Sequence, residues 1–364
     1  VTEDWYFVSH RLHIAIDAIS KGYSISLLTR ISKHKELIER SGVEVIEWNI
    51  NRSGANIFSE IRTIYSTFLA IKQSNPDIVH AVALKPLIYS AIFTRYSKVH
   101  NVFALGGLGF IFSSESLRAK VLKPIIIKTL KIIFKNTKNR LILQNLDDKN
   151  FFIENKIIKN DKVFLIRGSG VNTSEYYPDI KPKSSNVVIL PARMLWNKGV
   201  SEFIFCAKKF KKNKIPVRFC LVGGPDIHNP ESISVKELEQ WNKEGIIEWW
   251  GEQKNMPEVY SKASIVCFPS YREGLPKSLL EAASCALPIV AFDVPGCREI
   301  VKDGFNGFLS PFKEIDSLYI ALSKLIEDSE LSKKMGLNGR DMVLSEFSQE
   351  IISSQTISVW EELV

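Results

Sequence analysis

The sequence predicts an α/β protein built from two Rossmann-like domains, each with a doubly wound parallel sheet. Short runs of β-branched and aromatic residues alternate with helix-length segments along all 364 residues. This alternation is typical of parallel strands joined by right-handed helical crossovers. The pattern occurs twice, and a Pro-, Lys- and Ser-rich stretch without hydrophobic periodicity separates the two copies near residues 171–186. A chain of this length also suffices for about two domains.

The expected strands are short and mostly apolar. In the first half they fall at Ser24–Thr29, Glu44–Trp48, Ile78–Ala81, Asn101–Ala104, Arg140–Gln144 and Val163–Ile166. In the second half they fall at Val187–Leu190, Arg218–Val222, Ile246–Trp250, Ser264–Phe268, Ile289–Phe292 and Gly307–Leu309. Helical patterns separate nearly all of these runs.

The domain boundaries follow from this order. We expect a first domain over residues 1–170, a linker over 171–186 and a second domain over 187–348. Residues 349–364 have a helical pattern, and we expect this helix to cross back onto the first domain. The chain opens with the loop-like "EDWYFVSHR", where an α/β domain usually has a strand. We therefore expect the first strand to be truncated to its last residues.

Composition places the chain among ordinary globular proteins, with 45% hydrophobic and 24% charged residues. The five cysteines all lie in the second half, mostly in apolar runs, and none forms a C-x-x-C pair. We expect them to be buried free thiols in a reducing compartment. No uncharged apolar run reaches about 18 residues, so the sequence predicts no membrane span.

The net charge of +8 is concentrated in the first half, where residues 1–180 carry 25 Lys and Arg against 16 Asp and Glu. Such an excess suits nucleic acid, anionic lipid or a phosphorylated substrate. Among these three partners, the stretch Lys123–Lys138 favours anionic lipid. On a helix, Lys128, Lys131, Lys135 and Lys138 form a stripe beside a wide apolar arc. This pattern is typical of a helix at a membrane interface, although a core-facing helix with a solvated lysine face has it too. No nucleic-acid motif occurs, so we expect no nucleic acid partner.

The segment "YREGLPKSLLEAASCALP" (residues 271–288) holds two glutamates with seven residues between them. Glu273 lies in a turn, and Glu281 lies in a helix that we expect to begin at Pro276. The start of a helix offers free N–H groups and a positive dipole end to a phosphate. Two carboxylates flanking an anion site match a sugar nucleotide, with hydroxyls at both ends of a diphosphate. The alternative is a pair of solvated surface glutamates.

A basic loop, "PARMLWNKGV" (residues 191–200), follows the first strand of the second half. Arg193 and Lys198 at that strand end can neutralise a diphosphate leaving group, and a solvated basic loop is the alternative. "LVGGPD" (residues 221–226) places Gly223 and Gly224 after the next strand, which is a weak signal because most such pairs mark tight turns.

Taken in chain order, "ARMLWNKGV", "LVGGPD", "YREGLPKSLLEA" and "PGCREIVKDGFNGFL" resemble the retaining GT-B glycosyltransferases of the E-x7-E group. This group, the glycosyl transferases group 1, includes bacterial surface-polysaccharide enzymes. The resemblance implies that Glu281 binds ribose hydroxyls, that Glu273 approaches the donor sugar, and that Arg193 and Lys198 hold the diphosphate. The implied donor site is completed by backbone and side-chain groups of Gly199, Gly223, Gly224, Gly274, Leu275, Lys277 and Ser278.

The first half resembles the acceptor domain of the same group. "NVFALGGLGFIF" is similar to a Gly-rich loop of enzymes that use undecaprenyl-diphosphate-linked acceptors, and Gly106, Gly107 and Gly109 would allow close approach of a ligand. A plain strand-to-helix turn is the alternative. Some relatives have a histidine in this loop, where this chain does not. His10 and Arg11 either contact an acceptor phosphate or serve the helix ends.

The resemblance implies a retaining transfer of a hexose or N-acetylhexosamine from a UDP-sugar to a lipid-linked (undecaprenyl-diphosphate) saccharide, in O-antigen, capsule or exopolysaccharide biosynthesis. The chain contains no Asp-x-Asp sequence, and we expect neither a metal nor another cofactor. We expect a cytoplasmic protein, peripheral at the inner face of the cell membrane. A UDP-sugar epimerase of the same fold and a non-enzymatic two-domain sugar-binding protein remain alternatives.

Overall fold

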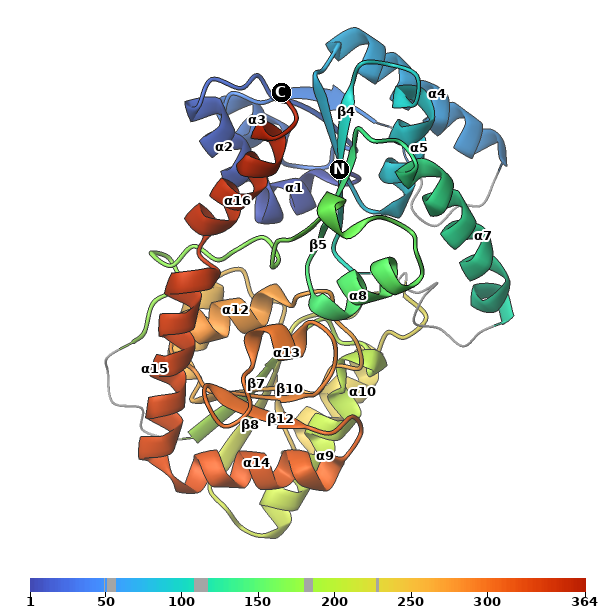
Figure 1. The fold of residues 1–364 in the computed structure, drawn as a ribbon. Helices are drawn as coiled ribbons and strands as arrows, with labels where there is room; N and C mark the ends of the chain where they lie inside the picture. Colours follow the sequence, from blue (N-terminus) through green and yellow to red (C-terminus); the bar gives the residue numbers. More distant parts are fainter. Residues whose placement is uncertain (49, 51–56, 108–116, 180–185, 227–228) are drawn as a thin grey trace. The chain divides into compact units, whose positions relative to one another are not determined.

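The computed structural model describes residues 1–48, 50, 57–107, 117–179, 186–226 and 229–364. The chain forms two compact units (Figure 1). The first contains Val1–Gly170 together with Gln349–Val364, and the second contains Val171–Ser348.

The second unit has one parallel sheet, whose strands lie in the order β12-β11-β10-β7-β8-β9. Their bounds are β7 Asn186–Pro191, β8 Val217–Val222, β9 Glu248–Gly251, β10 Ile265–Phe268, β11 Ile289–Phe292 and β12 Gly307–Ser310. The chain builds outward from β7 through β8 to β9 and then returns to add β10 on the other side of β7. Strand order therefore reverses between β7 and β10. In doubly wound sheets, ligands bind beyond the carboxyl ends of the strands at such a reversal.

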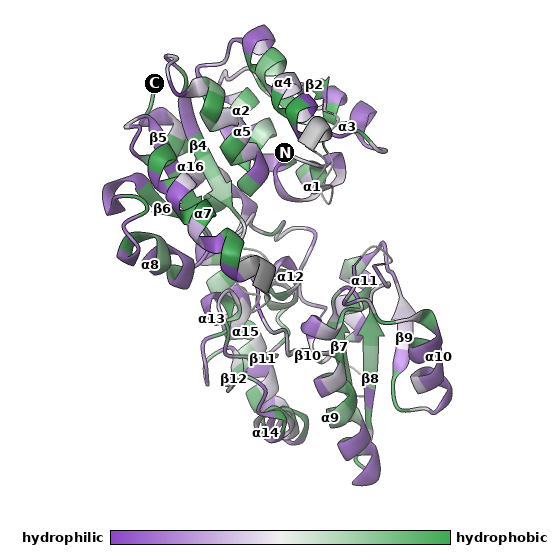
Figure 2. Ribbon diagram, turned by 90° about the vertical axis from the view of Figure 1, so that its right-hand side faces the viewer, coloured by the Kyte–Doolittle hydropathy of each residue, from purple (hydrophilic) through white to green (hydrophobic). Residues whose placement is uncertain are grey.

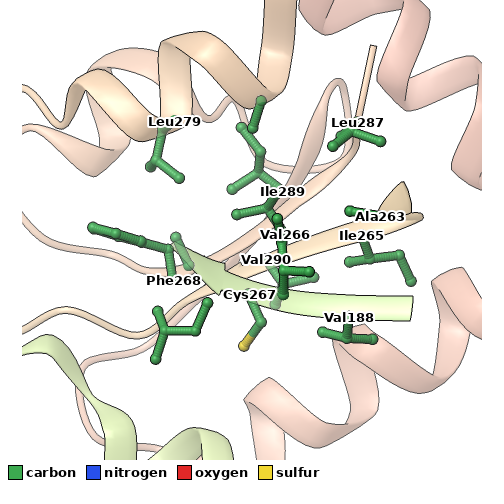
Figure 3. Close-up of a cluster of buried hydrophobic side chains, with 14 of the residues drawn as sticks. Val188, Ala263, Ile265, Val266, Cys267, Phe268, Leu279, Leu287, Ile289 and Val290 are labelled. Atoms are coloured by element: carbon green, nitrogen blue, oxygen red, sulfur yellow. The ribbon is translucent and has the colours of Figure 1, made fainter. Parts of the chain in front are cut away.

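Strand β10 lies in the centre of this sheet and is buried on both faces. All four of its residues, Ile265–Phe268, are buried, and they pair with Val188 and Ile189 of β7 and with β11. Figure 3 shows the side chains of this strand among those of its neighbours, with Leu279 of a helix over one face. A strand buried on both faces needs a continuous apolar run instead of an alternating one, which "IVCF" supplies.

Helices cover this sheet through apolar faces. α9 buries Phe203, Ala207 and Phe210 and ends in three lysines, which suit the negative end of the helix dipole. α10 begins with a capping box formed by Ser234 and Glu237. The helices of the second unit are α9 Val200–Lys212, α10 Val235–Lys243, α11 Met256–Lys262, α12 Lys277–Ser284, α13 Cys297–Ile300, α14 Ile315–Glu327 and α15 Ser329–Glu346. Figure 2 shows β8 as hydrophobic along most of its length and α10 with many hydrophilic residues.

The first unit contains two parallel sheets. Strands β1 (Ser26–Thr29) and β2 (Glu44–Glu47) form one, and β3 (Ile78–Val82), β4 (His100–Leu105), β5 (Asn139–Leu143) and β6 (Val163–Leu165) form the other. The helices of this unit are α1 Asp4–His10, α2 Leu12–Ser20, α3 Lys35–Arg40, α4 Ile57–Ser74, α5 Leu84–Thr94, α7 Leu117–Phe134, α8 Leu146–Glu154 and α16 Gln349–Glu361.

Helix α16 belongs to the first unit although it ends the chain, and it lies beside α2 (Figure 1). Its Trp360 is buried against Tyr23 and His80, and the indole Nε1 donates a hydrogen bond to His80 Nδ1 at 3.2 Å. Burial of this large side chain anchors the end of the chain to the first unit.

A cavity of about 560 Å³ separates the two sheets of the first unit, where the sequence predicted one sheet. Residues of both β1 and β3 line it, together with Val1, Arg11 and Trp48. Among the described strands, β1 pairs with β2 alone and β3 pairs with β4 alone, and residues of both strands line the cavity. Residues 1–4 lie parallel to the end of β1 on its edge opposite β2: Val1 N donates to Leu28 O at 3.1 Å, Arg30 N donates to Thr2 O at 3.2 Å, and Glu3 forms a parallel bridge with Arg30. The predicted truncation of the first strand stays a prediction.

The predicted strands are all present in the described residues, with ends that shift by a few residues. The strand expected at Ser24–Thr29 begins at Ser26, and the one expected at Ile246–Trp250 spans Glu248–Gly251. The helix expected at Lys123–Lys138 is α7, Leu117–Phe134, so Lys135 and Lys138 lie beyond its end and that part of the prediction is wrong. All five cysteines are buried and free, as predicted. Among the helices described, none combines the length and apolarity that crossing a bilayer requires.

Candidate functional site

Two loops meet beyond the carboxyl ends of β7 and β10, at the reversal of strand order in the second unit. The loop after β7 forms a short 3-10 turn at Trp196–Lys198, and Gly199 follows in a left-handed conformation before α9. The loop after β10 is fixed to it, since Tyr271 N donates to Asn197 O at 3.0 Å. A Cβ on Gly199 would lie 2.0 Å from the carbonyl oxygen of Pro269, so this close approach requires glycine.

Lys198 and Glu273 form an ion pair between these loops, Nζ to Oε1. The Ser270 hydroxyl donates to the same carboxylate oxygen at 2.6 Å. The two side chains are only 17% and 13% exposed. Glu273 therefore is not a solvated surface residue. The Lys198 side chain lies where a cation for the donor diphosphate is expected.

Arg193 has a different carboxylate partner. Its Nη1 lies 2.7 Å from Asp226 Oδ2, in the loop after β8, and the arginine side chain is 61% exposed. An exposed pair of this kind contributes little to stability, so the guanidinium can exchange partners at low cost. The two predicted diphosphate cations thus come from the same loop but pair with carboxylates of two different loops.

The glycines after β8 differ from each other. A Cβ on Gly223 would lie 1.9 Å from Ala192 O, and its φ is +144°, so the close packing of the β7 and β8 loops requires this glycine. Gly224 would make only ordinary contacts, the nearest being 3.6 Å from Glu252 Cβ. The close packing of the β7 and β8 loops therefore explains why residue 223 is glycine, without reference to any ligand.

Glu281 lies in α12, which begins at Lys277. Pro276 is the N-cap in extended conformation (ψ 114°), so the expectation that it is the first helical residue is off by one position. The Glu281 carboxylate is buried, and burial raises its pKa above the usual range. Tyr260 Oη lies 3.0 Å from Oε2, and Lys277 Nζ lies 3.6 Å from Oε1. The surface-glutamate alternative is therefore wrong for Glu281 as well.

The loop that carries Glu273 also packs against the start of α13. Gly296, with φ +82°, would place a Cβ 2.5 Å from Gly274 O and 2.9 Å from Glu273 O. The backbone of Glu273 and Gly274 thus rests directly on Gly296. Leu275 packs on the core of the second unit. Ser278 O lies 3.0 Å from Tyr260 Oη, as Glu281 Oε2 does, so these two acceptors share the one hydroxyl proton.

Sequence reasoning missed several groups at this site. Ser270, three residues before Glu273, had a local signal, because a hydroxyl at that spacing in a turn can reach the carboxylate. Asp226 and Tyr260 had none, since their partners lie 33 and 21 residues away in the sequence. Only the folded sheet brings them together.

The predicted acceptor residues lie in the first unit. His10 ends α1, its ring stacks on Tyr6 at 4.2 Å between centroids, and the Ser9 hydroxyl lies 2.6 Å from Nδ1. Arg11 is buried and lines the cavity of this unit. It is the C-cap residue of α1, where its N–H donates to Phe7 O, and the N-cap residue of α2, without a side-chain cap bond.

The glycine-rich loop begins at the end of β4. A Cβ on Gly106 would make an ordinary 3.5 Å contact with Gln144 Oε1, and Gly107 has φ +135°. Gly109 lies outside the described residues. Within the described ranges, no group of three or more His, Cys, Asp or Glu side chains is arranged to hold a metal ion.

Two family models match the chain. The model described as "Glycosyl transferases group 1" matches residues 178–342, and the model described as "Glycosyl transferase 4-like" matches residues 1–145. The first match contains the β7, β8, β10 and α13 loops described above.

Two curated relatives align over most of the chain. An N,N'-diacetylbacillosaminyl-diphospho-undecaprenol alpha-1,3-N-acetylgalactosaminyltransferase from Campylobacter jejuni is 26% identical over 337 residues, covering 89% of this chain and 87% of the relative. A UDP-Gal:alpha-D-GlcNAc-diphosphoundecaprenol alpha-1,3-galactosyltransferase from Escherichia coli is 27% identical over 310 residues, covering 80% and 77%.

Solved structures show the same fold. A sucrose-phosphate synthase from Thermosynechococcus elongatus superimposes with a TM-score of 0.78 at 19% identity, over 97% of this chain and 92% of that chain. HepE from Anabaena, in complex with UDP and glucose, superimposes with a TM-score of 0.76 at 19% identity, over 97% and 95%. With matching models for both halves, relatives along most of its length and structural neighbours of the GT-B fold, the chain belongs to the glycosyl transferases group 1 and is a GT-B glycosyltransferase.

Proposed function

We propose that the chain transfers a hexose or N-acetylhexosamine from a UDP-sugar to an undecaprenyl-diphosphate-linked saccharide, with retention at the anomeric carbon, in the biosynthesis of a bacterial surface polysaccharide. Both curated relatives are named for undecaprenol-diphosphate-linked acceptors, and one is named for a UDP-sugar donor. HepE, which has the same fold, was solved with UDP and glucose. Membership of a glycosyltransferase family argues against the epimerase and the binding protein.

One observation carries the proposal for the donor site. Lys198, Glu273 and the first turn of α12 come from loops at the point where strand order reverses, and Lys198 and Glu273 are in direct contact there. A cation and a helix N-terminus favour a diphosphate, and a carboxylate favours sugar hydroxyls. A diphosphate and a hydroxylated sugar are adjacent parts of a sugar nucleotide.

In the proposed reaction, the bond between the anomeric carbon and the diphosphate oxygen breaks, and its electron pair leaves with UDP. The acceptor hydroxyl oxygen bonds to the same face of that carbon, and its proton passes to the leaving phosphate oxygen. Negative charge grows on the diphosphate as this bond breaks, so fixed positive groups stabilise the transition state. Lys198 and the Lys277 and Ser278 amides supply them.

Donor binding changes the partner of Lys198. In the structure, Lys198 pairs with Glu273 in a half-buried place. A diphosphate offers a competing anion to the lysine and frees Glu273 to accept hydroxyls of the sugar. Arg193 can join by leaving its exposed contact with Asp226.

The test is product analysis. The purified protein is incubated with a synthetic undecaprenyl-diphosphate-linked saccharide and a panel of UDP-sugars; mass spectrometry gives the added sugar and NMR gives its anomeric configuration. Lys198→Ala serves as the inactive variant, and Lys333→Ala, at an exposed lysine of α15, serves as the matched control. An α-linked product from an α-linked donor is expected. Inversion at the anomeric carbon, or turnover unaffected by Lys198→Ala, would contradict the proposed mechanism.

We also propose that α7 brings the protein to an anionic membrane. Its apolar arc is divided in two: Leu130 and Phe134 are buried in the first unit, whereas Val121, Ile125 and Ile132 are exposed. The exposed apolar residues adjoin exposed Lys128 and Lys131 on the helical wheel, and exposed Lys135 follows the helix end. Lys138 donates to Ser97 O at 2.8 Å. The buried residues fit the core-facing alternative, and the exposed apolar residues beside the lysines support the proposed membrane contact.

Membrane binding is measured by cosedimentation with vesicles of phosphatidylglycerol and phosphatidylcholine at increasing salt. Surface lysines near such a membrane add about 1 kcal/mol each, so reversal of Lys128, Lys131 and Lys135 to Glu should release the protein. The control reverses three exposed lysines of the second unit, Lys254, Lys333 and Lys334. Equal release by both triple variants would show that net charge, and not α7, decides binding.

A further inference from the structure

The buried carboxylate of Glu281 is held between two tyrosines. The Tyr260 hydroxyl, from α11, lies 3.0 Å from Oε2, and Tyr176, from the segment before β7, is close enough to interact electrostatically with this carboxylate. The two rings meet edge to face, with centroids 6.1 Å apart and planes at 65°. Lys277, one turn earlier on α12, lies 3.6 Å from the other oxygen, Oε1.

Tyr176 is fixed in place by its own backbone. Its carbonyl oxygen accepts from Ser284 Oγ at 2.6 Å and from Arg340 Nη1 at 2.7 Å. The same guanidinium donates to Ser284 O at 2.9 Å and to Thr173 O at 3.1 Å. Arg340 of α15 therefore ties the 173–176 segment to the end of α12, next to Glu281. Planar, charged donors with several acceptors hold a segment more rigidly than a single neutral bond does.

This arrangement fixes the orientation of the carboxylate. Tyr260 occupies Oε2, while Oε1 lies toward Lys277, in the first turn of α12, where the helix presents its free N–H groups. A carboxylate that is clamped through one oxygen keeps the other oriented for a ligand, and such a preorganised acceptor loses less entropy on binding.

We propose that Tyr176 and Tyr260 are positioning residues, which orient Glu281 toward the ribose hydroxyls of the donor nucleotide. This inference rests on the proposed function, in which Glu281 accepts those hydroxyls. The tyrosines act through Glu281 and have no need to touch the donor.

Calorimetric titration with UDP and with 2',3'-dideoxy-UDP tests the inference, because the second ligand lacks the hydroxyls that Glu281 would accept. We expect Tyr260→Phe to weaken UDP binding about 3- to 10-fold, the value of one well-placed hydrogen bond, and Tyr176→Phe, which removes a hydroxyl near the same carboxylate, to weaken it by less. Both should leave the affinity for 2',3'-dideoxy-UDP as in the wild type. Phenylalanine keeps the ring packing. Tyr319→Phe, which removes an α14 hydroxyl that accepts a hydrogen bond from Asn213 just after α9, is the control and should change neither affinity.

Glu281→Gln distinguishes a failure of the proposed donor site from a failure of the positioning role of the tyrosines. If it weakens UDP but spares 2',3'-dideoxy-UDP, the donor site stands, and the tyrosine variants then decide the inference. Equal weakening of both ligands by the tyrosine variants, or no weakening of either, would overturn the positioning role. If Glu281→Gln leaves UDP binding unchanged, the assignment of Glu281 in the proposed function is itself wrong.

Discussion

Gly296→Ala tests whether the backbone of the Glu273 loop must keep its place for sugar transfer. Gly296 has φ +82°, and a Cβ there would lie 2.5 Å from Gly274 O and 2.8 Å from Gly274 C. Carbon and oxygen atoms without a bond between them stay above about 3 Å, so the Glu273–Gly274 backbone or the start of α13 has to move by several tenths of an ångström. The backbone conformation of Gly296, φ +82° and ψ −45°, is sparsely populated by residues with a Cβ and costs about 1–2 kcal/mol in them.

Two effects should follow from this substitution. The strain should lower the melting temperature of the second unit by about 2–8 °C, since 1 kcal/mol corresponds to about 2–4 °C in a domain of this size. Displacement of Glu273 should lower the rate of transfer by about 10- to 100-fold, because misplacement by 1 Å can cost about 100-fold. The assay is differential scanning calorimetry together with initial rates, using the UDP-sugar found by product analysis.

Gly304→Ala is the matched control for this experiment. Gly304 has φ +72°, and a Cβ there would meet nothing within 4 Å, so it shares the positive φ without the clash. We expect a similar or smaller loss of melting temperature and nearly unchanged transfer. If both variants transfer sugar at the same rate, contact between Gly296 and the Glu273 loop has no role in activity.

Three further predictions concern the same unit. Burial raises the pKa of Glu281, so UDP affinity should fall as pH drops through that raised pKa; calorimetry from pH 5 to 8 should show the fall in the wild type and its absence in Glu281→Gln. The same raised pKa means that this group favours folding at low pH and that this contribution is lost as pH rises through it. Lys198→Ala should weaken UDP binding about 10- to 100-fold and leave uridine binding unchanged, because only the diphosphate carries charge; equal loss for both ligands would contradict the clamp. Gly223→Ala should lower the melting temperature more than Gly224→Ala, since only the first Cβ meets a backbone atom, at 1.9 Å; equal melting temperatures would refute this packing argument.

The sequence by itself predicted the strands, because a buried parallel strand needs a local run of apolar residues. The apolar composition of "IVCF" and "IVAF" alone predicts buried strands, whichever strands they pair with. It also placed Glu273 in a turn and Glu281 in a helix, since Gly, Pro and helix formers act over a few residues. The end of α7 was missed by four residues: lysines continue its helical pattern, but the backbone turns toward β5 after Phe134.

Tertiary structure alone decided which of these groups meet. Lys198 and Glu273 are 75 residues apart in the chain, and their contact exists because β10 adds to the sheet beside β7. Arg340 reaches Tyr176 across 164 residues, and Glu281 is buried only because α11 and the segment before β7 cover it. Local patterns encode which residues prefer a strand, turn or helix; the neighbours of a side chain depend on strand order and packing, which no short stretch of sequence contains.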